Sequence, residues 1–253
     1  MLAPSTASVQ FVLDDFSVRK ILVVTAHPDD VDFGAAGSVA VWTSRGIEVS
    51  YCIVTDGDAG GADTGISRAD MPRIRRKEQT EAAAAVGVTD LHWLGFPDGR
   101  VVADLELRKA ISRVIRVVRP DRIVCQSPDR VIERIYASHP DHLAAGEATI
   151  CAVYPDARNA WSFPELLDDE GLEPHTVPEV WMMAIAPGSA NRFVDTTAEI
   201  DRKVAALLCH ASQLVGREDT VGPMVRAWSE GNARLAGLDE GCCAEGFLRI
   251  DTA

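Results

Sequence analysis

Over roughly the first 155 residues, short apolar runs rich in β-branched residues alternate with longer segments whose apolar residues recur at helical spacing. The run ILVVTA at residues 21–26 is typical of a buried parallel strand, which lacks polar alternation because both its faces are covered. Segment 71–86 is typical of a helix, and Gly87 directly after it favours termination there. The expected strands in this region are 21–26, 48–55, 91–94 and 122–126, and the expected helices are one that ends near Gly46, 71–86, 104–118 and one that begins near Pro140.

This alternation predicts an α/β fold with a mostly parallel sheet and helices on its faces. The rest of the chain predicts an irregular segment at 154–178, strands at 179–186, 192–195 and 247–250, and helices at 197–213 and 223–235. Because no linker interrupts the pattern, we expect a single domain over residues 19–253, preceded by a loosely attached leader at residues 1–18. Ligands of open α/β sheets bind beyond the carboxyl ends of the strands, so residues directly after the strands are the first place to look for chemistry.

Charge and cysteine usage narrow the function classes. The chain carries 25 basic and 38 acidic side chains, a formal net charge of −13. This balance argues against a nucleic-acid partner, because duplex binding relies on Lys and Arg that neutralise phosphates. We expect no membrane span, since no apolar run approaches the roughly 18 residues that one requires, and the N-terminus lacks the features of a secretory signal. Six scattered cysteines without a CxxC pair are expected to be free thiols, which predicts a cytoplasmic location.

Two similar tetrapeptides carry the candidate chemistry. HPDD occupies residues 27–30, directly after the first expected strand, and HPDH occupies residues 139–142 at the start of a helix. His139 and His142 are three residues apart, so one helical turn can aim both rings the same way. Imidazole and carboxylate together suit Zn²⁺, Mn²⁺ or Fe²⁺ better than Mg²⁺. Two histidines and one carboxylate would give a catalytic zinc site its three protein ligands, and the spare Asp and His could serve as base and acid.

Each motif also has a plain structural explanation. A turn with an Asp cap accounts for either tetrapeptide alone, but it accounts poorly for both in one chain. Asp141 could simply be a carboxylate at a helix N-terminus, where the macrodipole favours it. Arg75 lies in a cluster with two other arginines, which by default is a solvated helix face.

The pair of tetrapeptides resembles the PIG-L/LmbE-like deacetylases. AHPDD at 26–30 and HPDH at 139–142 carry the resemblance, and TDG at 55–57, RxxE at 75–78 and PDG at 97–99 agree with it. It covers about residues 19–215 and implies a Rossmann-like α/β/α sandwich with a mostly parallel sheet. It also implies hydrolysis of N-acetyl groups on N-acetylglucosamine-containing molecules with a divalent metal, usually zinc.

The resemblance also implies roles for individual residues. His27, Asp30 and His142 become metal ligands, Asp29 becomes the general base, and His139 either stabilises the tetrahedral oxyanion or protonates the leaving amine. The remaining implied roles are Asp141 as the partner that tunes His139, Arg75 as a substrate-binding arginine and Asp98 as a contact for sugar hydroxyls.

We therefore expect a zinc-dependent deacetylase that acts on an acetylated amino sugar or its conjugate. One alternative is an amidase that cleaves a larger amide, such as a thiol–sugar conjugate; another is a catalytically silent metal- or sugar-binding module. A dinucleotide oxidoreductase is disfavoured, because the loop after the first strand lacks GxGxxG and presents carboxylates where a pyrophosphate would lie. A homo-oligomer stays open, as does a contribution of His210 or residues 155–178 to the pocket.

Overall fold

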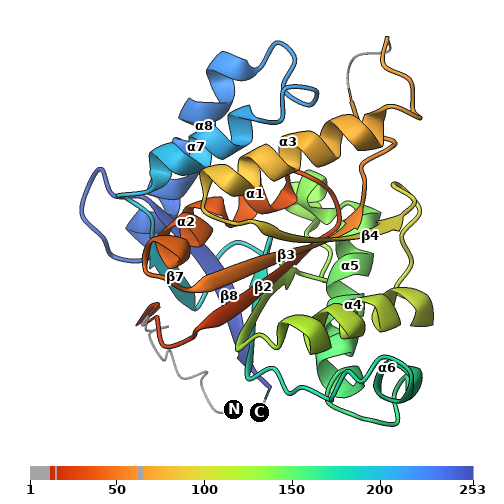
Figure 1. Ribbon diagram of the computed structural model, residues 1–253. Coiled ribbons are helices and arrows are strands. Elements are labelled where there is room, and N and C mark those ends of the chain that lie inside the picture. Colours follow the sequence, from red (N-terminus) through yellow and green to blue (C-terminus); the bar gives the residue numbers. More distant parts are fainter. Residues whose placement is uncertain (1–11, 15, 62–64, 253) are drawn as a thin grey trace, which may run out of the picture.

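One sheet of eight strands forms the centre of the described part of the chain (Figure 1). The computed structural model describes residues 12–14, 16–61 and 65–252. The strand order is β1-β7-β8-β6-β5-β2-β3-β4. Neighbouring strands are parallel except that β8 runs antiparallel to both β6 and β7. The strands are β1 (Val12–Leu13), β2 (Lys20–Thr25), β3 (Glu48–Thr55), β4 (Asp90–Phe96), β5 (Arg122–Gln126), β6 (Glu179–Met183), β7 (Arg192–Asp195) and β8 (Ala244–Asp251).

The order of the strands creates a switch point between β2 and β5. From β2 the chain continues outward through β3 to β4, and it then returns to place β5 on the other side of β2. The connections that leave β2 and β5 therefore diverge, and in open α/β sheets ligands bind beyond the carboxyl ends of the strands at such a point.

Helices cover both faces of the sheet, because alternate residues of each buried strand point to opposite faces. Ile21 and Val23 of β2 pack in a core with α2 and α3, whereas Leu22 and Val24 pack in a second core with α4 and α5. Figure 1 shows α1, α2, α3, α7 and α8 on one side and α4, α5 and α6 on the other. The helices are α1 (Asp30–Gly34), α2 (Ala36–Ser44), α3 (Met71–Ala85), α4 (Leu105–Val118), the 3-10 helix η1 (Ile132–Ser138), α5 (Pro140–Cys151), the π-helix η2 (Ala152–Asp156), α6 (Glu165–Asp168), α7 (Ile200–Leu208) and α8 (Glu218–Leu235).

The predicted α/β/α sandwich with a mostly parallel sheet is confirmed, and several elements in the second half of the chain differ from those expected. The segment expected to be irregular, residues 154–178, includes the end of η2 and all of α6. Helix α8 begins at Glu218 and not at Pro223, since Glu218 and Asp219 suit the first turn of a helix. Strand β8 is longer than expected because it pairs with β6 on one side and β7 on the other, and the sequence of one strand does not reveal that context.

Part of the segment expected to be a leader belongs to the sheet. Strand β1 pairs with β7, and the buried Asp14 carboxylate accepts hydrogen bonds from the Arg122 guanidinium (2.9 and 3.1 Å) and from Trp42 Nε1 (2.7 Å). Residues 1–11 and 15 lie outside the described residues, so the domain boundary at residue 18 stays a prediction. Residues 12–14, however, contact the core directly and are not loosely attached.

Two further expectations concern membrane-spanning helices and the cysteines. Across the described residues, no helix has the length and apolar character needed to cross a bilayer. All six cysteines are free thiols, as expected. The cytoplasmic location stays a prediction.

Candidate metal centre

The two tetrapeptides meet at the switch point. His27 follows β2, Asp98 follows β4, and residues 139–142 form the start of α5, which follows β5 and η1. His27 and His142, which are 115 positions apart in the sequence, have ring nitrogens 3.2 Å apart. The fold therefore brings the predicted residues to one place, beyond the carboxyl ends of the central strands.

Local backbone chemistry fixes both turns. The Asp30 carboxylate accepts a hydrogen bond from the His27 backbone N–H (2.7 Å), which closes the first turn. Asp29, within it, has a φ of 85°, a left-handed conformation that is rare for a residue other than glycine. In the second turn Pro140 occupies the first position of α5, and His139 caps the helix because its Nδ1 accepts the backbone N–H of Asp141 (3.2 Å).

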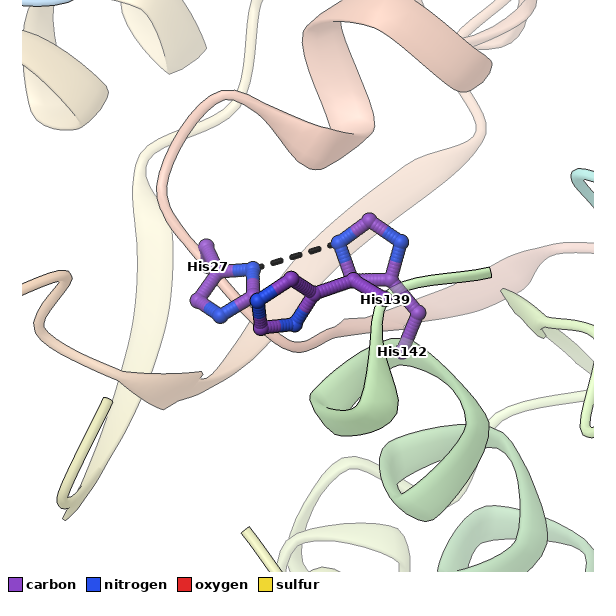
Figure 2. Close-up of side chains that lie close together, drawn as sticks. All are labelled: His27, His139 and His142. Atoms are coloured by element: carbon purple, nitrogen blue, oxygen red, sulfur yellow. Dashed lines mark hydrogen bonds between the residues drawn. The ribbon is translucent and has the colours of Figure 1, made fainter. Parts of the chain in front are cut away.

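Three imidazoles and one carboxylate converge above these turns. Figure 2 shows the rings of His27, His139 and His142 side by side, and donor atoms of all three lie within 4.8 Å of one another. Asp30 bridges two of these rings: its Oδ2 lies 3.4 Å from His27 Nδ1 and its Oδ1 lies 3.0 Å from His142 Nε2. This combination of nitrogen and oxygen donors fits a transition metal such as zinc.

Contacts on the far side of each ring indicate the tautomers. His27 Nε2 faces Asp98 Oδ1 (3.1 Å) and Asp141 Oδ2 (3.3 Å), so it is the nitrogen that carries the proton in the neutral ring. His142 Nδ1 faces the carbonyl oxygen of Ala137 (3.4 Å) and donates to it. The lone pairs of His27 Nδ1 and His142 Nε2 then point at each other and at the Asp30 carboxylate. These two nitrogens and the carboxylate are all hydrogen-bond acceptors, and no donor among the described residues lies between them. A cation bound among them would accept their lone pairs and remove the repulsion.

The charges around His27 lead to the same conclusion. Burial lowers the pKa of His27, but the carboxylates of Asp30, Asp141 and Asp98 outweigh it and raise this pKa to about 12. The pKa of Asp30 lies well below its usual value, because the attraction of His142 and His27 outweighs its burial. The carboxylates around His27 therefore favour a positive charge at the centre of the cluster.

Asp29 lies beside this cluster in a different environment. Burial, opposed by the attraction of Arg75 and reinforced by the repulsion of Asp30, raises the pKa of Asp29 to about 6. Arg75 Nη2 donates to Asp29 Oδ2 (3.1 Å) and to the Pro28 carbonyl oxygen (2.5 Å). A carboxylate with a pKa near the ambient pH is suited to accept a proton and release it again.

Comparison with known proteins identifies the family. The model of the PIG-L family, described as GlcNAc-PI de-N-acetylase, matches residues 22–153, just over half of the chain. The chain belongs to the PIG-L family. The match includes both tetrapeptides and every strand from β2 to β5 except the first residues of β2.

Several similar proteins are named as deacetylases. A diacetylchitobiose deacetylase from Thermococcus kodakarensis is 33% identical over 78% of this chain and 70% of its own length. A probable N-acetyl-alpha-D-glucosaminyl L-malate deacetylase 2 from Bacillus cereus is 36% identical over 53% of this chain and 61% of its own. The solved N,N'-diacetylchitobiose deacetylase from Pyrococcus horikoshii superposes with a TM-score of 0.83 at 28% identity, over 93% of this chain and 85% of that chain.

Three residues lie in surroundings other than those that the sequence suggested. The Asp141 carboxylate contacts His27 and accepts the backbone N–H groups of Gly99 (2.7 Å) and Val101 (3.2 Å). Its charge also raises the pKa of His139, so its implied role beside that ring stays a prediction. Asp98 is buried against the His27 ring. Both carboxylates are thus partners of His27, and the PDG motif serves to bring them there.

Arg75 is also more enclosed than expected. It is not on a solvated helix face but 4% exposed, and its guanidinium donates to the carbonyl oxygens of Pro28 and Gly57 as well as to Asp29. A Cβ atom at Gly57 would overlap this guanidinium, which explains the glycine of the TDG motif. Arg75 therefore ties the turn at residues 27–30 to the loop after β3.

Gln79 and Asp32 are not among the residues predicted from the sequence. Gln79 accepts the backbone N–H of Asp29 (2.7 Å) and donates to Asp32 (2.9 Å), which in turn lies 2.8 Å from His210 Nε2. His210 was left open and lies behind Asp29 in this network. The helical spacing of Arg75 and Gln79, four residues apart on α3, was the signal that could have grouped them on one face.

Proposed function

We propose that this chain is a metal-dependent hydrolase that removes the N-acetyl group from an N-acetylglucosamine-type sugar or conjugate. The observation that carries the proposal is the convergence of His27 Nδ1, His142 Nε2 and the Asp30 carboxylate, with the carboxylate of Asp29 beside them. This arrangement supports hydrolysis, because it combines a cation site with a general base of suitable pKa.

His27, Asp30 and His142 would hold the metal, and we propose Zn²⁺ as its identity. Bound there, such an ion supplies Lewis acidity, which polarises a carbonyl oxygen and lowers the pKa of water toward ~7. Asp98 and Asp141 hold the Nε2–H of His27 and so keep its other nitrogen available for the ion. Two carboxylates on one ligand also increase the basicity of that imidazole.

Asp29 acts as the general base. Its carboxylate accepts a proton from the water that attacks the acetyl carbonyl, and Arg75 keeps one of its oxygens fixed (3.1 Å) during that transfer. We assign Arg75 to this positioning role, because both of its Nη nitrogens already donate within the protein, to Asp29, Pro28 and Gly57. The proton then passes to the leaving nitrogen as the C–N bond breaks, and acetate and a free amine are released.

His139 stabilises the oxyanion as a neutral hydrogen-bond donor. Its Nδ1 accepts the Asp141 N–H, so its proton is on Nε2. Burial lowers the pKa of His139 and outweighs the attraction of the Asp141 and Asp98 carboxylates, which keeps the ring neutral near pH 7. A neutral imidazole can still donate this proton's hydrogen bond to the developing charge, a contribution typically worth about 3 kcal/mol for one donor.

The substrate class follows from what the relatives' names have in common. Diacetylchitobiose, N-acetylglucosaminyl malate and the 2-acetamido-glucopyranoside of inositol all carry an acetylated amino group on a glucose unit, and they differ in what is attached to it. We therefore propose that the residues around the metal site bind the acetylated glucose unit. Residues farther from the metal would then decide which attached group is accepted.

Elemental analysis combined with acetate release tests the proposal. Purified protein is expected to contain a stoichiometric divalent metal and to release acetate from at least one member of a panel that includes free N-acetylglucosamine, diacetylchitobiose and the malate and inositol conjugates. Chelation should abolish release and Zn²⁺ should restore it. His27→Gln should lose the metal, whereas the matched variant His92→Gln, whose ring contacts only Asp90 in the contacts described (3.2 Å), should keep both metal and activity.

Three outcomes would contradict the proposal in different ways. Release of a larger acyl group but no acetate would favour the amidase alternative. Stoichiometric metal without turnover of any panel member would favour a silent binding module. Acetate release that survives complete metal removal would exclude the metal-dependent mechanism.

A further inference from the structure

A chain of buried polar side chains contacts the backbone of Asp29. Gln79, on the inward face of α3, is fully buried, and its side-chain amide bridges the turn at residues 27–30 and helix α1. Its Oε1 accepts the backbone N–H of Asp29 (2.7 Å), and its Nε2 donates to Asp32 Oδ2 (2.9 Å). The same Asp32 oxygen lies 2.8 Å from Nε2 of His210, which is 1% exposed.

The backbone of Asp29 needs such support. Its φ of 85° places a residue with a Cβ in the left-handed region, which costs on the order of 1 kcal/mol or more unless the surroundings hold it there. The Asp29 carbonyl oxygen accepts the N–H groups of Asp32 (2.9 Å) and Phe33 (3.0 Å), which fixes that end of the residue. Its N–H is fixed by Gln79 alone among the contacts described.

We propose that Gln79 is the positioning residue of the general base, and that the buried Asp32–His210 pair fixes the orientation of its amide. The inference rests on the proposed role of Asp29 as the base. A relaxed, right-handed Asp29 would rotate its Cα–Cβ bond away from the metal site, so the N–H···Oε1 hydrogen bond controls where the carboxylate lies.

The two partners of Gln79 are what make an amide necessary at this position. Asp29 offers a donor and Asp32 offers an acceptor, so only a side chain with one acceptor and one donor satisfies both. If the Gln79 amide were reversed, its NH₂ group would face the backbone N–H of Asp29 and its oxygen would face the Asp32 carboxylate. His210, held against Asp32, keeps that carboxylate from turning away from Gln79.

Gln79→Leu removes both hydrogen bonds at nearly constant size. At full metal loading, kcat is expected to fall about 100-fold, the loss that a misplaced catalytic group can cause, while KM and metal content stay as in the wild-type protein. The matched control is Ser212→Ala. It removes a buried hydrogen bond (2.7 Å) to Glu78, the residue before Gln79 on α3, and it should lower stability but not kcat. Wild-type kcat in Gln79→Leu would overturn the inference, as would an equal loss in Ser212→Ala.

A charge exchange gives a second test that does not depend on the leucine variant folding well. Gln79→Glu retains the acceptor for Asp29 but places a carboxylate against Asp32, and its kcat should be low. Adding Asp32→Asn restores a donor opposite residue 79, and Nδ1 of His210, which has no partner among the described contacts, can take the ring proton. The double variant should regain most of the lost kcat; a double variant as slow as Gln79→Glu would overturn the inference.

Crystal structures of the wild-type protein and Gln79→Leu separate this inference from the proposed function. The variant is expected to show Asp29 outside the left-handed region, with its carboxylate displaced. A left-handed Asp29 in Gln79→Leu would refute the positioning role whether or not the protein releases acetate. Absence of acetate release by the wild-type protein, together with the expected change at Asp29, would contradict the deacetylase proposal alone.

Discussion

Replacement of Asp141 by Asn distinguishes the structure's arrangement from the one that the sequence suggested. If Asp141 tuned His139, its loss would slow the chemical step. The structure places the carboxylate against His27 Nε2, and there the substitution should instead weaken metal binding. Asparagine has almost the same shape and can still accept one of the two backbone N–H groups, so the turn around Gly99 should persist.

The magnitude follows from how the His27 Nε2–H is shared. Outer partners of metal-binding histidines typically contribute 10–100-fold to metal affinity, which is about 1.4–2.7 kcal/mol. Asp98 approaches the same nitrogen slightly more closely (3.1 Å against 3.3 Å) and remains in the variant. We therefore expect a loss at the lower end, about tenfold, for Asp141→Asn and a larger loss when Asp98→Asn is added.

Competition against a chromophoric chelator measures this affinity directly. Apparent dissociation constants for Zn²⁺ are compared between the wild-type protein, each single variant and the double variant at one pH. Acetate release at saturating metal then gives kcat for the fully loaded protein, which should stay close to the wild-type value in Asp141→Asn.

The opposite pattern would refute the reasoning. Unchanged metal affinity together with a large fall in kcat of the loaded Asp141→Asn protein would mean that the carboxylate acts on His139 after all. A double variant no weaker than either single variant would mean that the two carboxylates do not share His27.

Three other predictions address the base, the anchored N-terminal residues and pH dependence. Asp29→Asn should lower kcat by about 10²–10⁴-fold with full metal content; retained turnover would exclude Asp29 as the base. Asp14→Ala leaves Arg122 buried beside Glu179 with one partner fewer, so urea titration should show a loss of about 3 kcal/mol of unfolding free energy with unchanged kcat; a loss within error would mean that residues 12–14 do not stabilise the domain. Burial lowers the pKa of His210, but the hydrogen bond and charge of Asp32 outweigh it and raise this pKa above 6.5. Because the folded state then binds the proton more tightly, the stability gain over His210→Gln should be full below pH 6.5 and shrink as pH rises through the folded pKa; a difference that grows with pH would contradict the assignment.

The sequence was most informative about the parallel core and least informative about long-range pairing. Strand β2 could be predicted because a strand covered on both faces must be apolar throughout, and ILVVT has that pattern. The short β1 could not be predicted, since a two-residue strand has no periodicity and its pairing with β7 depends on residues 180 positions away. The register of β8 between β6 and β7 is likewise a tertiary property.

The candidate site shows the same division between local and distant information. His27 and His142 could be singled out because each lies in a motif with recognisable chemistry. Each motif also follows a predicted strand, and the loops after parallel strands meet at the carboxyl edge of the sheet. The partners of Asp141 could not be predicted, because residues two positions apart, such as His139 and Asp141, invite pairing while the true partner His27 is more than 100 positions away. Gln79 was missed because an amide carries no charge and belongs to no catalytic motif.

The charge balance of the site explains why a divalent cation, and not a dinucleotide, suits this switch point. Asp29, Asp30, Asp98 and Asp141 supply four carboxylates against the single guanidinium of Arg75, so three negative charges are uncompensated when the imidazoles are neutral. A proton on an imidazole offsets one of them, whereas a divalent ion offsets two and also satisfies the facing lone pairs. A pyrophosphate would add negative charge where the fold already has an excess, although other doubly wound sheets bind dinucleotides at the corresponding switch point. The reaction is therefore set by the side chains after β2, β4 and β5 and not by the sheet that positions them.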